Sequence, residues 1–260
     1  MFSPDRWALT GISGVFADPF YSPGSDFIAQ GNTFITDLVC RDLAGEDVRR
    51  RALTYDVQFL TIFETAIRGT YTDHYPAFGN AQIMVAKLVW EFAAYWAVAA
   101  LPFLQGKLLD LEFGGAVASD VRRVLVAGAT LEQLFRDHHA TVGQREWPGR
   151  FISNRTSPAL YQLHLDLHEP FDDEALRAKY AANAELLEAI AVIIFHNAVR
   201  ELEGVEIDED AKLRPAAISL DPARWERDGL FDSEGVSLAE ARAQAEGIED
   251  MLLRRQVPAA

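Results

Sequence analysis

Apolar residues recur along most of the chain with the three- to four-residue period of an amphipathic α-helix. The clearest example is the stretch 27–42, in which the apolar positions fall on one helical face. Periodicity together with capping and breaking residues predicts further helices at 46–67, 80–104, 116–139 (interrupted or bent near Gly128), 158–168, 172–202, 221–225 and 237–255. A short strand is expected at 6–10. The fold class is therefore predicted to be mainly α, with a short N-terminal strand-turn segment before a helical domain.

Polar residues at both ends of the first helix set its expected boundaries. Ser25 or Asp26 is a suitable N-cap for a helix that starts at Phe27, and Gly45 is placed to end it. Cys40, the one cysteine of the chain, falls within the apolar periodicity of this helix. We therefore expect Cys40 to be a small buried hydrophobic residue.

Charged residues favour the ends of the second and the last predicted helices. Glu46 and Asp47 put negative charge at the start of the second helix, where the helix dipole favours it. Its predicted buried face consists of Leu53, Val57, Leu60, Phe63 and Ile67. In the last helix, Ser237 and Glu240 have the spacing of a capping box, and Arg254–Arg255 would lie at the negative end.

The apolar run 84–104 is long enough to cross a membrane, but it contains two charges, Lys87 and Glu91, and ends near Pro102. These charges favour a buried or groove-lining helix over a membrane span. Four aromatic residues of this run occupy more than one helical face: Trp90, Phe92, Tyr95 and Trp96. A core position is the preferred interpretation for them, and a pocket-lining role stays open for some.

Composition and charge restrict the class of protein. A chain of 260 residues with 49% hydrophobic residues has the length for one large domain or two small ones and should fold. Its net charge of −15 disfavours binding to nucleic acids and to anionic membranes. A single cysteine excludes an internal disulfide, and no signal peptide is visible after Met1. We therefore expect a cytoplasmic protein.

Glycine and proline interrupt the helical pattern most strongly between Gly11 and Asn32. Pro23 fixes its backbone φ angle, and Gly24 is expected to allow a positive φ and the close approach of a ligand. Because the turn leads into a helix N-terminus, its free N–H groups would form a general anion site. The segment is the strongest candidate for a functional site in the chain.

The string DPFYSPGSDFIAQGNTFITDLV in this segment resembles the C-terminal flavin-contacting segment of flavin-dependent halogenases and their oxidoreductase relatives. The resemblance covers about Trp7 to Leu43 well and the following helices loosely. In that family a DP-x-x-S-x-G turn lies against the isoalloxazine ring of FAD, and its backbone helps to hold the halide. The resemblance implies a cofactor-binding role for Gly11, Asp18, Pro19, Tyr21, Ser22, Pro23 and Gly24.

The chain departs from the family pattern in several places. Ile12 stands where the family has an aspartate, and isoleucine accepts no hydrogen bond. Neither a G-x-G-x-x-G fingerprint nor the W-x-W-x-x-P signature occurs, and no lysine can be given the family's catalytic role. At the turn, Tyr21 replaces the glutamate of tryptophan-specific members. An aromatic residue here resembles members that act on phenols or carrier-bound aromatics.

The resemblance implies that reduced FAD would react with O2, that halide would be oxidised to hypohalous acid, and that an aromatic substrate would meet it in a helical pocket. Residues 1–45 would be the flavin-contacting segment and 46–260 a helical substrate domain. The FAD-binding half is expected upstream, so that the chain would be a fragment, one half of a split enzyme or a decayed copy. The alternative is a non-catalytic helical binding domain that has lost flavin.

The histidines offer weaker candidates. His164 and His168 have the spacing of two helical metal ligands, but no third ligand can be named, so a polar helix face is preferred and no metal is expected. His138–His139 is expected at a helix C-terminus, and His196 is expected to be a satisfied core residue. Residues 73–75, in a loop between two helices, remain candidates for a substrate-facing role. The stretch 141–157 is expected to be a boundary or a long connection.

Overall fold

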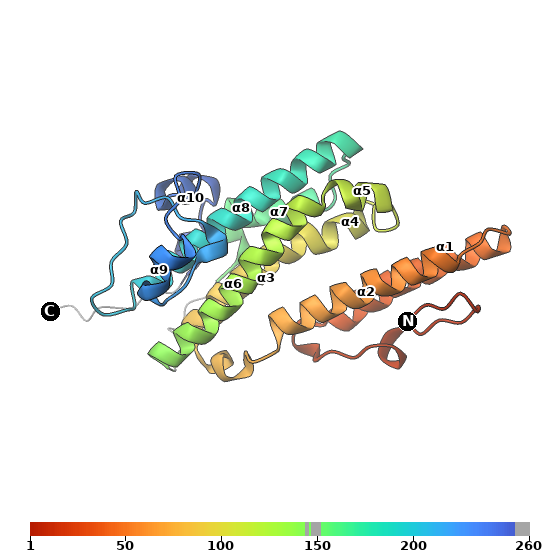
Figure 1. Ribbon diagram of the computed structural model, residues 1–260, viewed down its shortest axis with the longest axis horizontal. Coiled ribbons are helices and arrows are strands. Elements are labelled where there is room, and N and C mark those ends of the chain that lie inside the picture. Colours follow the sequence, from red (N-terminus) through yellow and green to blue (C-terminus); the bar gives the residue numbers. More distant parts are fainter. Residues whose placement is uncertain (144–145, 147–151, 253–260) are drawn as a thin grey trace. The chain divides into compact units, whose positions relative to one another are not determined.

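A computed structural model of the chain describes residues 1–143, 146 and 152–252 (Figure 1). It is mainly helical, and its described residues contain no sheet, which confirms the predicted fold class. The chain divides into two compact units, one formed by residues 1–72 with 108–110 and the other by the rest. The helices α1 (Pro23–Leu43) and α2 (Arg49–Thr70) both belong to the first unit, so this unit extends beyond residue 45, the predicted end of the flavin-contacting segment. The flavin-contacting role of residues 1–45 stays a prediction.

The first unit is a pair of helices with an N-terminal segment folded onto it. Its elements are η1 (Gly11–Ser13), η2 (Pro19–Tyr21), α1 (Pro23–Leu43) and α2 (Arg49–Thr70). Aromatic rings fill the seam between the helices, with the Phe34 and Tyr55 centroids 4.5 Å apart. The Phe2 ring of the N-terminal segment packs against Phe34 and Phe59. The unit is thus held together mainly by aromatic packing.

Three expectations for the N-terminal region are corrected. Residues 6–10 form no strand, and only an isolated antiparallel bridge joins Phe2 and Ala8. The helix α1 begins at Pro23 rather than Phe27, because proline at the first helical position already has a helical φ and needs no hydrogen-bonded N–H. Cys40 is exposed rather than buried, since it lies on the side of α1 away from the aromatic seam.

The buried face of α2 also differs from the prediction. Leu53 and Val57 are 60% and 66% exposed, whereas Ala52, Tyr55 and Phe59 are buried. The two aromatic side chains bring more apolar area into the seam than the aliphatic stripe would, and they rotate the helix accordingly. An apolar stripe of α2 therefore remains at the surface.

The connection between α1 and α2 follows the sequence signals closely. Gly45, with a φ of +84°, lies just after the end of α1 as expected of a helix-terminating glycine. Asp47 accepts a hydrogen bond of 3.0 Å from the N–H of Arg49, the first residue of α2. The helix thus starts slightly later than at Glu46, and Asp47 binds its free N-terminus.

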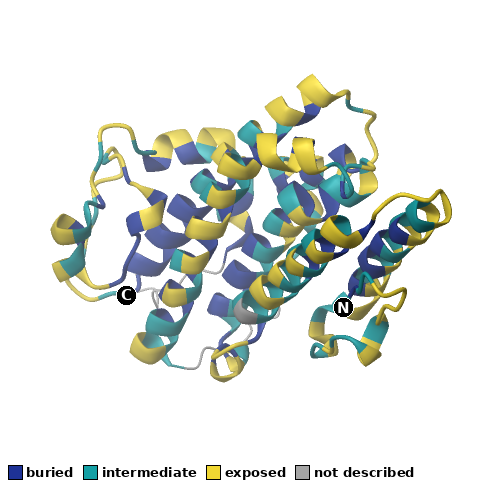
Figure 2. Cartoon of the chain, turned by 45° about the vertical axis from the view of Figure 1, so that its right-hand side comes forward, coloured by how far each residue is buried: buried dark blue, intermediate teal, exposed yellow. Residues whose placement is uncertain are grey.

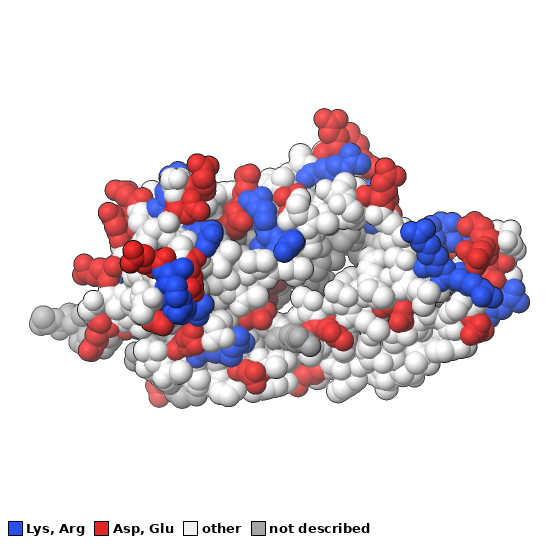
Figure 3. All heavy atoms as spheres, in the orientation of Figure 1, with Lys and Arg blue, Asp and Glu red and all other residues white. Residues whose placement is uncertain are grey.

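The second unit is built around one long buried helix, α8 (Asp173–Val199), whose inner positions include Leu187, Ile190 and Phe195. It packs against α6 (Ala118–Val142), α10 (Leu238–Gln244) and α11 (Ile248–Met251). The other elements are η3 (Tyr75–Gly79), α3 (Ala81–Ala94), η4 (Tyr95–Ala100), α4 (Leu101–Leu104), α5 (Leu111–Ala116), η5 (Asn154–Thr156), α7 (Pro158–Asp166), η6 (Pro215–Ala217) and α9 (Pro222–Asp228). Figure 2 shows that exposed positions occupy the outer sides of the helices and the loops, and Figure 3 shows both acidic and basic side chains at the surface.

The helix α6 is continuous through Gly128, contrary to the predicted interruption. A Cβ atom at Gly128 would lie 3.4 Å from the ring of Trp90 in α3, so the glycine permits the close approach of this ring. The glycine signal was therefore one of tight packing rather than of a bend.

The aromatic residues of the 84–104 run divide between the core and the surface. Trp90 and Trp96 are buried as preferred, whereas Phe92 and Tyr95 are 42% and 39% exposed. By length and composition alone, two stretches among the described residues could cross a membrane: Ala81–Leu104 and Asp173–Val199. Most of each stretch is buried, as in the core helix of a folded domain. The expectation of no membrane span stays a prediction.

The helices of the C-terminal region are shorter than expected. Ser237 and Glu240 form the predicted capping box at the start of α10. The expected single helix 237–255 instead breaks at Gly247, whose φ is +78°, and resumes as α11. The expected role of Arg254–Arg255 and most of the stretch 144–151 lie outside the described residues.

Candidate functional site

The predicted turn is fixed to the first unit at Asp18. The Asp18 carboxylate accepts a hydrogen bond of 2.9 Å from the N–H of Phe20 and so begins η2. Its carbonyl oxygen accepts a 2.8 Å hydrogen bond from the hydroxyl of Tyr71, at the end of α2. The turn is thus held at both its own backbone and the neighbouring helix.

The chain reverses at Ser22, and not at Gly24. Ser22 has a left-handed φ of +55°, and its N–H donates a 2.8 Å hydrogen bond to the carbonyl of Pro19. Gly24 lies in the first turn of α1 with an ordinary negative φ, so the positive φ that glycine allows is not used there. The space in front of Gly24 is open, because a Cβ at this position would meet no heavy atom within 4 Å.

The structure brings most of the predicted cofactor-binding residues together in this turn. Pro19 and Tyr21 form η2, and Ser22, Pro23 and Gly24 continue into α1. Gly11 begins η1 and has a φ of +58°. A Cβ atom at this position would lie 3.6 Å from the side chain of Ile28, which belongs to the second turn of α1. The segments η1 and η2 thus both contact α1, and Ser22, Pro23 and Gly24 form its start.

The electrostatics of the turn are mixed. The side chain of Ser22 makes no capping hydrogen bond, which leaves the start of α1 without a side-chain cap from that position. Asp26 places a carboxylate in the same first turn. This carboxylate competes with an external anion for the positive end of the helix dipole. The start of α1 thus already carries a negative charge, which weakens it as a site for an external anion.

A buried group of charged side chains lies in the second unit, where α3, α6 and the residue before η3 approach one another. Lys87 is only 1% exposed and forms an ion pair with Glu91, one turn along α3. From α6, the Arg136 guanidinium comes within 3.5 Å of Nε2 of His74. Glu132 belongs to the same group, since its charge interacts with Lys87 and Arg136.

Burial determines the charge state of this group. The pKa of His74 is lowered to about 4, mainly by burial and to a smaller extent by the positive charges of Lys87 and Arg136. The imidazole is therefore neutral at pH 7. Burial likewise raises the pKa of the Glu132 carboxyl, while Lys87 opposes this shift. Since His74 is fully buried, it does not face a substrate at the surface. The sequence signal for the group was the pair Lys87 and Glu91 within an apolar run.

The remaining histidines are dispersed. The rings of His164 and His168 lie 6.1 Å apart, and His164 also packs near Trp96. No three His, Cys, Asp or Glu side chains group as metal ligands in the described part of the chain, and the expectation of no metal stays a prediction. His138 is buried near the C-terminal end of α6. His196 is in the core as expected, but the described residues give its Nε2 no hydrogen-bond partner, and burial lowers its pKa to about 4.

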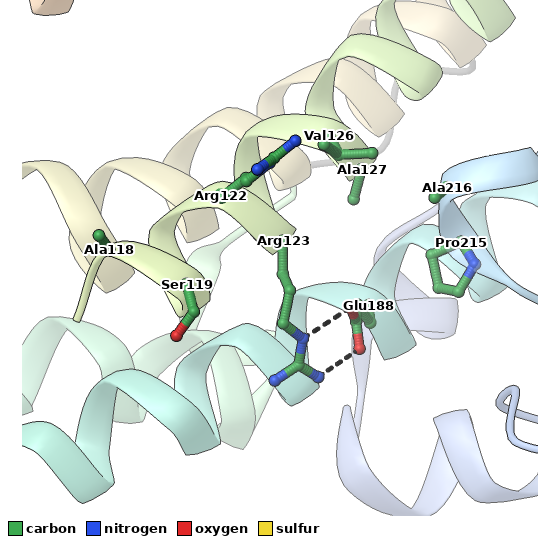
Figure 4. A pocket seen from close by; sticks show the side chains of 9 residues that line it. All are labelled: Ala118, Ser119, Arg122, Arg123, Val126, Ala127, Glu188, Pro215 and Ala216. Carbon is green, nitrogen blue, oxygen red and sulfur yellow. Dashed lines mark hydrogen bonds and ion pairs between the residues drawn. The ribbon is translucent and has the colours of Figure 1, made fainter. Parts of the chain in front are cut away.

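A pocket of about 450 Å³ lies between α6, α8 and η6 (Figure 4). Its lining residues are Ala118, Ser119, Arg122, Arg123, Val126, Ala127, Glu188, Pro215 and Ala216. Val126, Ala127, Pro215 and Ala216 give the wall an apolar part, and the Arg123–Glu188 ion pair joins α6 to α8 in the same wall. No pattern in the sequence indicates this pocket, because its walls come from three separate parts of the chain.

Comparison of the chain with models of protein families, with curated proteins and with solved structures finds no significant match. The resemblance of 7–43 to the halogenase segment therefore rests on its own residues.

Proposed function

We propose that the chain is the C-terminal, mostly helical part of a flavin-dependent halogenase-like oxidoreductase that acts on an aromatic substrate. The observation that carries this proposal is the DPFYSPG turn. Its sequence resembles the family's flavin-contacting segment, and its first helical turn is open at Gly24. A flat ring edge can approach the backbone there without a steric barrier.

The residues of the turn fit the isoalloxazine edge of FAD. The open surface at Gly24 gives room for the ring, and Ser22 and Tyr21 flank it along the chain. The Asp18 hydrogen bonds keep the turn rigid in this position. FAD, when bound and reduced, would supply the reaction with O2 that oxidises a halide. The role of this chain would be to position the ring and exclude water from its edge.

Binding of the nucleotide half of FAD would require a second protein domain. The described residues contain neither a parallel sheet nor a glycine-rich turn between strand and helix, which normally hold the pyrophosphate. An FAD-binding partner half would supply them. Large exposed apolar side chains in the N-terminal segment support such a partner: Trp7, Leu9, Ile12, Phe16 and Phe20.

A non-catalytic helical binding domain is the second candidate. It is favoured by Ile12, which replaces the family's aspartate and is 82% exposed, and by the pocket in the second unit. That unit has a hydrophobic core of its own and needs no flavin to form it. The two candidates differ in whether the turn at 18–24 contacts a flavin ring.

The purified chain is expected to be colourless and to retain no FAD, because it holds only the ring edge and no nucleotide site among its described residues. The measurement is an absorption spectrum in the region of the oxidised flavin band near ~450 nm, followed by a test for flavin released on denaturation. As a control, FAD is added to the chain, free flavin is removed by gel filtration, and the spectrum is recorded again. One equivalent of bound flavin after this step would show that the chain needs no partner half.

A further inference from the structure

The charged residues of the pocket between α6, α8 and η6 do not all have the same role. Arg123 donates two hydrogen bonds to Glu188, of 3.0 Å from Nε and 2.6 Å from Nη2. Its Nη1 also lies 3.5 Å from the carboxylate of Asp120. The Arg123 guanidinium thus interacts with two carboxylates, which neutralise its charge and make it a poor partner for a negatively charged ligand.

Arg122, the next residue, is in a different situation. It is exposed and makes no hydrogen bond or ion pair with the part of the chain that the structure describes. In Figure 4 its side chain runs along α6 towards Val126. Ser119, one turn earlier, also lines the pocket. A guanidinium beside apolar surface suits a carboxylate attached to a flat apolar body.

We propose that this pocket binds a small aromatic carboxylate. The ring would pack on Val126, Ala127 and Pro215, and the carboxylate would accept hydrogen bonds from Arg122. A pocket of about 450 Å³ is within the usual range for small molecules and accommodates one or two rings. A singly charged carboxylate is favoured over a phosphate because Glu188 and Asp120 lie close by and repel a second negative charge.

This site is separate from the proposed flavin contact. All of its residues belong to the second unit, whereas the turn at 18–24 belongs to the first. It requires neither a cofactor nor a partner half. Failure of the flavin proposal would leave the carboxylate site unaffected, and the reverse also holds.

Titration of the full chain with naphthalene-2-carboxylate, followed by the fluorescence of the naphthalene, tests the proposal. The neutral 2-naphthamide has the same ring without the charge. We expect the carboxylate to bind roughly tenfold or more tightly than the amide, as a charge-assisted hydrogen bond to Arg122 predicts. Arg122→Gln should bring the two affinities together. Raising the salt concentration should weaken the carboxylate only.

Two further variants make the result specific. Arg177→Gln removes another exposed arginine without a partner among the described residues, outside the pocket, and should leave the affinity unchanged. Ala216→Trp fills the pocket from an exposed position and should abolish binding of both compounds without unfolding the chain. Equal binding of carboxylate and amide by the parent protein, or unchanged carboxylate binding by Arg122→Gln, would overturn the proposal. Absence of binding altogether would do the same.

Discussion

Replacing Glu91 by glutamine is expected to lower the free energy of unfolding by about 3 kcal/mol, because it removes a carboxylate that forms an ion pair with the buried Lys87 ammonium. Lys87 is 1% exposed and the Glu91 side chain 17%, so little water reaches the pair. The Glu132 carboxyl also interacts with Lys87 and offsets part of the loss. Urea unfolding followed by circular dichroism measures the effect.

The double variant Lys87→Met/Glu91→Leu should be less destabilised than Glu91→Gln alone. Removing both charges replaces a costly buried pair by apolar side chains of similar size. Lys212→Gln is the control, since the Lys212–Glu240 ion pair is exposed on both sides and should change stability by less than about 1 kcal/mol. If Glu91→Gln costs no more than this control, the Lys87–Glu91 pair is not buried as described.

Gly247→Ala is expected to destabilise the chain strongly, with a cost above about 3 kcal/mol. Gly247 has a φ of +78°, and a Cβ there would lie 2.7 Å from the carbonyl oxygen of Thr156 and 2.8 Å from Cα of Ser157. Both of these are backbone atoms, which cannot move aside as a flexible side chain can. The Ser157 hydroxyl, which donates a 2.6 Å hydrogen bond to the carbonyl of Glu246, holds the two segments at this distance.

Gly204→Ala separates the two causes of this loss. Gly204 has a similar φ of +71°, but a Cβ there would meet no heavy atom within 4 Å. Alanine at this position should therefore cost only the left-handed backbone penalty, about 1–2 kcal/mol. Thermal unfolding of the two variants measures the difference. Equal losses would mean that the contact between Gly247 and residues 156–157 adds nothing to the cost.

Local signals in the sequence were sufficient for much of the fold. The acidic start of α8 at Asp172 and the capping box at Ser237 were recognisable because both involve neighbouring residues only. The apolar periodicity of α1 was also visible, although its start was not. Proline at position 23 serves as a helix start as well as a turn residue, and local sequence does not separate these two uses.

Other features depend on contacts between distant residues. The buried face of α2 is decided by Phe2 and Phe34, which lie far away in the sequence, and the aliphatic stripe at Leu53 and Val57 was therefore misleading. The bend predicted at Gly128 does not occur, because this glycine makes room for Trp90, which lies on another helix. Periodicity reports that a helix has an apolar face, but not which neighbour covers it.

The candidate sites show the same division. The turn at 18–24 is one continuous segment and could be selected from the sequence, although the left-handed residue proved to be Ser22. The group around Lys87 and His74 joins α3, α6 and the start of η3, and the Arg122 pocket joins α6, α8 and η6. No spacing rule connects such residues, so these sites became visible only in the folded chain.

Contact between a flavin ring and the turn at 18–24 can be measured residue by residue. Lumiflavin, which carries the ring without the nucleotide, is titrated into ¹⁵N-labelled protein and the backbone amide resonances are followed. We expect weak binding that shifts the amides of Tyr21, Ser22, Gly24 and Ser25 and leaves the second unit unchanged. Gly24→Val should abolish these shifts, because its side chain fills the open space, while helical circular dichroism stays the same. Absence of shifts in residues 18–26, or equal shifts in Gly24→Val, would contradict a flavin-contacting role for the turn.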